Sequence, residues 1–128
     1  NRCPTYTAME QWYSDFNKFL NPGLIWDSGL SSDACNEARG VVDSNAPHKF
    51  TAQKTFSRGG SVPVMIRETL QEGLRNESQT ENVRKLPAKT RYGCNSYFKG
   101  NLVKVVCIYK ECFAYSKHAP GEICDYFV

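Results

Sequence analysis

The sequence predicts an α+β domain in which helices pack against an antiparallel sheet and disulfide bonds stabilise the fold. Three observations lead to this fold class. Apolar residues recur at helical spacing in two segments, residues 7–20 and 63–75. Two later segments, residues 91–98 and 102–110, are rich in Tyr, Val, Ile and Cys and are separated by a short turn. The chain of 128 residues contains six cysteines and is too short for two independent cores, so we expect one domain over residues 1–128.

The composition argues against two classes of partner. Lys and Arg number 16 and Asp and Glu 13, giving a net charge of +3 that is spread along the chain. Without a basic run or a basic helix face, no nucleic-acid partner is expected. The longest apolar run, residues 105–109, is far shorter than the roughly 20 residues that cross a bilayer, so no membrane span is expected.

The first helix is expected over residues 7–20, because its apolar residues follow the spacing of one helix face. They are Met9, Trp12, Tyr13, Phe16, Phe19 and Leu20. Thr7 and Glu10 form a T-x-x-E capping box at its start, and the Asn-Pro-Gly of residues 21–23 ends it. The aromatic cluster is interpreted as core, and the alternative is that part of it forms an exposed binding patch.

An extended stretch over residues 24–27 leads to a second helix, with Ser31 or Ser32 as its N-cap. The inner side of this helix carries mostly small residues that permit close packing, namely Ala34, Cys35, Ala38 and Val41. Residues 50–56 then favour a strand that ends at Gly59-Gly60.

A third helix is expected over residues 63–75, with Ser61 as its N-cap and a buried apolar stripe at every fourth residue. Residues 76–85 carry almost no apolar side chains and predict a surface loop. This loop begins with the triplet Asn76-Glu77-Ser78, an acceptor for N-linked glycosylation in a secreted protein.

Two cysteines lie symmetrically about the predicted hairpin turn. Cys94 and Cys107 are expected to face each other, or nearly so, across the two strands. Their bonding stays open, because six cysteines allow many connectivities. An even number of cysteines without a C-x-x-C pair favours three disulfides and an extracellular location over a metal site. The six are Cys3, Cys35, Cys94, Cys107, Cys112 and Cys124, and the last two fall in a tail, residues 112–128, for which irregular structure is expected.

Three stretches of the chain carry motifs that occur together in one family. They are Leu24-Ile25-Trp26-Asp27 followed by Leu30, then residues 88–94 (Ala-Lys-Thr-Arg-Tyr-Gly-Cys), then residues 105–109 (Val-Val-Cys-Ile-Tyr). In this order they resemble the CAP superfamily, also called SCP/TAPS, and within it a short, degenerate nematode ASP or venom-allergen-like protein. The resemblance implies an α-β-α sandwich with a small central antiparallel sheet and an extracellular location.

Typical members of that family hold two His and two Glu in a cleft suited to a divalent metal. On the resemblance, His48 corresponds to the first His and Glu68 to the second Glu. Gln53 or a neighbour stands where the other Glu is expected, and Glu81 stands where the second His is expected. These positions mark a degenerate cleft, so no metal and no other cofactor is expected. The interpretation of Glu68 that we favour is an exposed carboxylate beside Arg67 on a solvated face.

Two enzyme classes of similar length do not fit the sequence. His48 and His118 would be the acid and base of a ribonuclease, but a lysine-centred phosphate site is not found. A lysozyme needs a Glu in an apolar setting with an Asp nearby, whereas Glu10 belongs to the capping box and Asp15 to the polar side of its helix. No catalytic residue is predicted, and the protein is not expected to be an enzyme.

The hairpin tip is the candidate contact with a partner. Tyr97, Phe98 and Lys99 lie beside the turn, where aromatic side chains are hard to bury. The expected function is that of a secreted, non-enzymatic protein that binds an extracellular host protein, such as a receptor or an immune factor, as a parasite effector. The alternative, which the family resemblance implies, is a carrier of a sterol or fatty acid. Metal-dependent hydrolysis ranks third.

Overall fold

The computed structural model describes residues 3–6, 8–41 and 46–111. Within these residues the chain forms four helices and four strands. In chain order they are α1 (Met9–Leu20), β1 (Ile25–Trp26), α2 (Ser28–Ala38), β2 (His48–Thr55), α3 (Val62–Gly73), α4 (Glu77–Arg84), β3 (Arg91–Lys99) and β4 (Leu102–Lys110). Among the described helices, none combines the length and apolarity that a membrane span requires. Cys112 and Cys124 lie outside the described residues.

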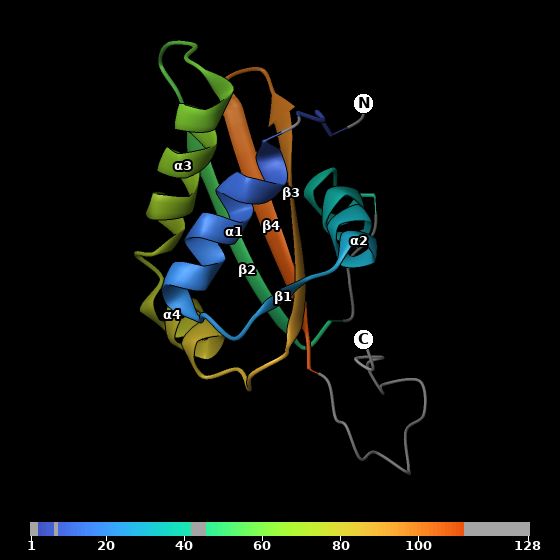
Figure 1. Ribbon diagram of the computed structural model, residues 1–128. Helices are drawn as coiled ribbons and strands as arrows, with labels where there is room; N and C mark the ends of the chain where they lie inside the picture. The colour runs from blue at the N-terminus through green and yellow to red at the C-terminus, as the bar shows by residue number, and fades with distance from the viewer. Residues whose placement is uncertain (1–2, 7, 42–45, 112–128) are drawn as a thin grey trace.

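The four strands form one mixed sheet in the order β1-β3-β4-β2. β3 and β4 pair antiparallel, as do β4 and β2, while the two-residue β1 runs parallel to β3. Helices α1, α3 and α4 lie on one face and α2 lies on the other (Figure 1). The expected α-β-α sandwich is therefore confirmed. The antiparallel sheet is confirmed for the three long strands, and β1 adds a parallel edge.

β4 accounts for the longest apolar run of the sequence. Successive residues of a strand point to opposite faces of the sheet. Val105, Cys107 and Tyr109 belong to the core beneath α1 and α3, while Val106 and Ile108 belong to the core beneath α2. A strand that is covered on both faces therefore needs apolar residues at every position.

α1 begins one residue later than the predicted capping box requires. Ala8 is the N-cap residue, whereas a T-x-x-E box would place Thr7 there. Thr7 itself lies outside the described residues. At the other end, the Asn21 amide donates hydrogen bonds to the backbone carbonyls of Val83 (3.0 Å) and Leu86 (2.9 Å). Asn21 therefore both ends α1 and fastens it to the end of α4.

α2 begins earlier than predicted, because Asp27 caps it and not Ser31 or Ser32. The Asp27 carboxylate accepts hydrogen bonds from two backbone N–H groups of the first turn, at 2.8 and 3.3 Å. Ser31 lies inside the helix, and its hydroxyl donates to the backbone carbonyl of Cys94 at 2.7 Å. The hydroxyl that was expected to cap the helix thus attaches it to β3.

The inner face of α2 packs unusually close to the sheet. Ala34 and Ala38 are buried as predicted, but Val41 lies beyond the end of the helix and is 60 % exposed, so its predicted place on the inner side is wrong. Gly93 of β3 completes the contact. A Cβ added to Gly93 would lie 2.2 Å from the backbone nitrogen of Ser31, so only glycine fits there.

Residues 76–85 form a helix where a loop was predicted. α4 begins after Asn76, whose side-chain oxygen accepts a hydrogen bond from the backbone N–H of Gln79 at 3.2 Å. Thr80 and Val83, three residues apart, are its buried residues. One buried apolar residue in eight is too weak a pattern to predict a helix from sequence. The strand over residues 50–56 and the helix over 63–75 are confirmed within two residues at each end.

Gln79 also connects α4 to the outer edge of β2. Its side-chain amide donates to the backbone carbonyl of Thr51 (2.8 Å) and accepts from the backbone N–H of Thr51 (3.1 Å). The same amide nitrogen lies 3.1 Å from the carbonyl of Gly73. The side chain therefore occupies the position that a peptide group of a further strand would take.

Two disulfides are present within the described residues. Cys94 and Cys107 are direct partners in the β3–β4 ladder and are bonded to each other, with a Cα–Cα distance of 4.0 Å. The predicted symmetry about the turn is thus confirmed. Cys3 is bonded to Cys35 and ties the N-terminal segment to α2.

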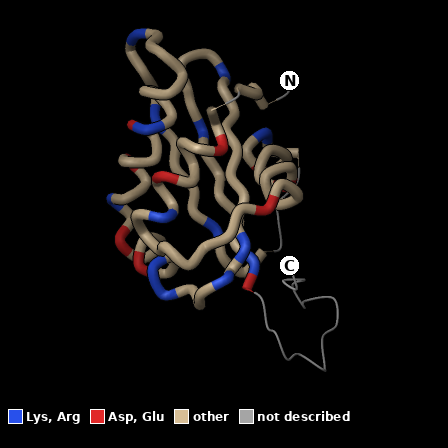
Figure 2. The backbone as a smooth tube through the Cα atoms, in the orientation of Figure 1, with Lys and Arg blue, Asp and Glu red and all other residues tan. Residues whose placement is uncertain are grey.

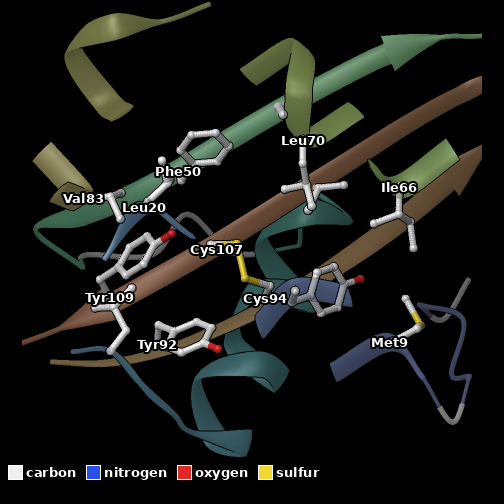
Figure 3. Close-up of a cluster of buried hydrophobic side chains, with 14 of the residues drawn as sticks. Met9, Leu20, Phe50, Ile66, Leu70, Val83, Tyr92, Cys94, Cys107 and Tyr109 are labelled. Carbon is white, nitrogen blue, oxygen red and sulfur yellow. A yellow bond between two sulfur atoms is a disulfide. The ribbon is translucent and has the colours of Figure 1, made fainter. Parts of the chain in front are cut away.

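The Cys94–Cys107 disulfide lies within the cluster of buried hydrophobic side chains (Figure 3). A buried polar network surrounds it. The Asn17 amide nitrogen donates to the carbonyl of Tyr13 at 2.9 Å and lies 3.3 Å from the Cys94 sulfur. Its oxygen accepts a hydrogen bond from the Tyr109 hydroxyl. Burial raises the pKa of the Tyr13 and Tyr109 hydroxyls above the ordinary value, so both stay neutral and hydrogen-bonded.

Candidate binding site

The structure does not bring the three residues of the predicted cleft together. His48 begins β2 and lies 3.1 Å from Glu111. Glu68 of α3 pairs with Lys54 at 3.2 Å, near the other end of β2. At about 3.3 Å per residue, the Cα atoms of His48 and Lys54 lie roughly 20 Å apart along the strand.

Glu81 belongs to a third element, α4, where its carboxylate lies 4.0 Å from the amine of Lys85. Across residues 3–6, 8–41 and 46–111, no group of three or more His, Cys, Asp or Glu side chains is placed to hold a metal ion. The charged residues of both signs are interspersed along the chain (Figure 2). The predicted cleft positions therefore form three separate pairs, and their functional role stays a prediction.

The aromatic residues of the hairpin tip are half-buried on opposite faces of the sheet. Tyr97 packs against the core beneath α2, and Phe98 packs against the core beneath α1 and α3. Lys99 and Gly100 are exposed at the turn. A partner contact through Tyr97, Phe98 and Lys99 stays a prediction, and most of the aromatic surface there serves packing.

A groove lies between α1 and α3, which run side by side over the sheet (Figure 1). The groove has a volume of about 520 Å³. Its lining is mostly apolar and consists of Trp12, Asp15, Phe16, Phe19, Pro63, Ile66, Arg67, Leu70, Gln71 and Leu74. We call it the α1–α3 groove.

The helical periods of both helices place these side chains. Trp12, Phe16 and Phe19 recur at i, i+4 and i+7 along α1 and face α3. Ile66 and Leu70, four residues apart on α3, are fully buried and form the floor. The Phe16 ring also contacts the Phe50 ring of β2 edge-on, at 5.2 Å between centroids, so the floor is continuous with the core.

The predicted aromatic cluster divides between core and surface. Tyr13 is buried, Trp12 and Phe16 are half-buried, and Phe19 is 75 % exposed at the rim. The signal for this division is present in the sequence. At 100° per residue, the apolar stripe of α1 spans roughly 120°, with Phe19 at one edge and Trp12 next to it.

The lining of the groove contains few ionisable side chains. Of its described side chains, Asp15 and Arg67 are the ionisable ones. An arginine stays charged in proteins and does not exchange a proton during catalysis. A single carboxylate does not supply the pair of carboxyl groups, one acid and one base or nucleophile, that glycoside hydrolysis requires. An open apolar groove with two opposite charges at its rim can hold an apolar group and orient it.

The sequence comparisons identify a family and a relative. The model of a family described as the 15 kDa excretory/secretory protein, ES15, matches residues 12–111. The 30 kDa antigenic glycoprotein of the nematode Trichostrongylus colubriformis is 32% identical over 94 residues, which cover 69% of this chain and 68% of that protein.

Three solved structures share the fold. The hookworm platelet inhibitor superposes with a TM-score of 0.57 at 11% identity, over 85% of this chain and 72% of that one. Manganese-bound Ac-ASP-7 gives a TM-score of 0.59 at 19% identity, over 81% of this chain and 66% of that one. A second structure of Ac-ASP-7, an Ancylostoma-secreted protein, gives a TM-score of 0.56 at 17% identity, over 87% of this chain and 73% of that one. The fold expected from the resemblance to nematode ASP-like proteins is therefore confirmed.

Proposed function

We infer the function from one premise: this chain belongs to the family of 15 kDa excretory/secretory proteins. On that premise we propose that it is secreted and binds an extracellular protein of the host without chemically altering it. The disulfides support an oxidising extracellular location. The name of one structural neighbour, a platelet inhibitor, supports action on a host by a protein of this fold.

The observation that carries this proposal is Phe19 at the rim of the α1–α3 groove. A large aromatic side chain that is 75 % exposed loses hydrophobic stabilisation unless a partner covers it. Trp12 and Arg67, which also line the groove, belong to the residue types that dominate binding energy at protein interfaces. A small ligand seated on the floor would leave Phe19 in water, whereas a protein surface would bury it.

The test compares variants at two exposed apolar positions on different parts of the surface. Wild-type protein, Phe19→Ser and Val41→Ser are immobilised and exposed to host plasma and to detergent-solubilised host cell-surface proteins, and the retained proteins are quantified. We expect a protein that wild-type and Val41→Ser retain equally and that Phe19→Ser loses by about tenfold, the effect of losing roughly 1.4 kcal/mol. Equal retention by the wild type and both variants would contradict binding through the groove.

The groove also supports a second candidate function, the carriage of an apolar ligand. Its volume of about 520 Å³ and its apolar floor with a few rim charges match small-molecule sites. Arg67 is placed to pair with a carboxylate headgroup. A fluorescent fatty-acid analogue would bind wild-type protein and Arg58→Ala, which alters an exposed arginine outside the groove lining, but would bind Arg67→Ala more weakly. No saturable binding by the wild type would exclude this candidate.

A further inference from the structure

The only N-x-S/T triplet in the 128 residues, Asn76-Glu77-Ser78, lies at the start of α4. All three residues are exposed. Asn76 has the extended backbone conformation of an N-cap residue, with φ −81° and ψ 91°. The acceptor triplet therefore faces water at the start of α4. None of its three side chains is packed against the protein where a sugar would be added.

Helix capping and glycosylation use different atoms of Asn76. The cap uses Oδ1, which accepts the backbone N–H of Gln79 at 3.2 Å. A glycan would be attached to Nδ2. The side chain remains an amide after that attachment, so Oδ1 keeps its lone pairs and the cap is retained. The folded structure is thus compatible with a modified Asn76.

We propose that Asn76 carries an N-linked glycan. The co-reactant is a lipid-linked oligosaccharide pyrophosphate of the secretory pathway, so the proposal rests on the secretion proposed above. A bond forms between Nδ2 and the anomeric carbon of the first sugar, and the bond from that carbon to the pyrophosphate oxygen breaks. The lipid pyrophosphate leaves with the electron pair, and one proton of Nδ2 passes to a base of the transferase. The Ser78 hydroxyl is the second group of the triplet that the transferase requires.

The glycan would occupy a defined place on the molecule. Gln79 donates its backbone N–H to Asn76 Oδ1, and its side chain binds the backbone of Thr51 at the outer edge of β2. Leu74, two residues before Asn76, lines one end of the α1–α3 groove. The sugar would therefore stand between the β2 edge and that end of the groove, and would limit what approaches either one.

The experiment expresses the full chain behind a heterologous secretion leader in insect cells, which makes it independent of the native route of secretion. Protein from the medium is digested with peptide N-glycosidase F and analysed by intact and peptide mass spectrometry. We expect the wild type and Ser78→Thr to lose a glycan mass, with conversion of Asn76 to Asp. Asn76→Asp removes the acceptor nitrogen but keeps the capping oxygen, and Ser78→Ala removes the hydroxyl of the triplet but keeps Asn76. Neither variant is expected to change mass on digestion.

The melting temperatures of the four secreted, digested proteins are then compared. Equal melting temperatures would show that loss of the glycan in the variants is not a folding defect, as the retained cap predicts. Wild-type protein that is secreted without a glycan would overturn the proposal while leaving the proposed secretion intact. A glycan that persists in Asn76→Asp would also overturn it, because the sugar would then lie elsewhere.

Discussion

The two faces of the sheet are covered in opposite ways. On one face, α2 places Ala34 and Ala38 against β4, and Gly93 lets its backbone touch that of β3. On the other face, α1 and α3 stand on large side chains such as Phe50 and Tyr109 and leave a groove between them. Small residues bring α2 into backbone contact with β3, whereas large aromatic residues lie beneath α1 and α3. The α1–α3 groove therefore lies on the face with the larger side chains.

The largest expected effect is on the closed face, from Gly93→Ala. The added Cβ would lie 2.2 Å from the backbone nitrogen of Ser31 and 2.5 Å from the carbonyl carbon of Leu30, which do not move cheaply. We expect a loss of about 3 kcal/mol or more in the free energy of unfolding, measured by urea denaturation. Gly59→Ala is the matched control, because its Cβ would meet nothing within 4 Å. Equal effects of the two substitutions would refute backbone contact between α2 and β3.

The second effect concerns the polar network beneath the groove. Asn17→Leu leaves the buried Tyr109 hydroxyl without its acceptor, and we expect a loss of about 2–3 kcal/mol. Tyr109→Phe removes the hydroxyl and should cost less. In the double variant the two losses should not add, with a coupling of about 1 kcal/mol or more in denaturation experiments. Strict additivity would show that the bond between these residues contributes no stability.

The third effect is on the pH dependence of stability. Burial raises the pKa of Tyr13, Tyr92 and Tyr109 in the folded state, so above about pH 10 the unfolded chain loses protons that the folded chain keeps. The free energy of unfolding should therefore be level below pH 9 and fall above pH 10, by up to about 1.4 kcal/mol per pH unit for each tyrosine. Tyr109→Phe should make this alkaline slope shallower. An unchanged slope would indicate that Tyr109 ionises equally well in both states.

The smallest effect is expected at the groove rim. Phe19→Ser should change the free energy of unfolding by no more than about 0.5 kcal/mol, because the ring is 75 % exposed. Leu70→Ala, which truncates the buried floor, should cost about 2–5 kcal/mol. Thermal and urea denaturation of both variants would check this contrast. A large loss from Phe19→Ser would mean that the rim serves packing, and the case for a partner there would weaken.

Local sequence patterns predicted the parts of the fold that depend on the spacing of neighbouring residues. The stripe at Ile66 and Leu70, the two strands over residues 91–98 and 102–110, and the symmetry of Cys94 and Cys107 follow from local patterns, and all three predictions were confirmed. The cap of α2 was missed because Asp27, Ser31 and Ser32 all have suitable side chains, and tertiary contact with β3 decides between them.

The α1–α3 groove could be predicted only in part. The sequence shows a wide apolar stripe on α1, but the floor of the groove continues into the Phe50 ring of β2, which contacts Phe16 and is distant from it in sequence. The cleft at His48, Glu68 and Glu81 was expected from family resemblance alone, and these side chains instead pair with Glu111, Lys54 and Lys85.

The amide of Gln79 has a consequence for the behaviour of many copies of this protein in solution. β2 ends the sheet, and an uncovered edge strand is a template for aggregation with other chains. The Gln79 side chain saturates one N–H and one C=O of Thr51 in the middle of that strand. A second molecule cannot add its own strand there without first displacing α4. The segment that was predicted as a loop therefore covers part of an edge at which other chains could pair.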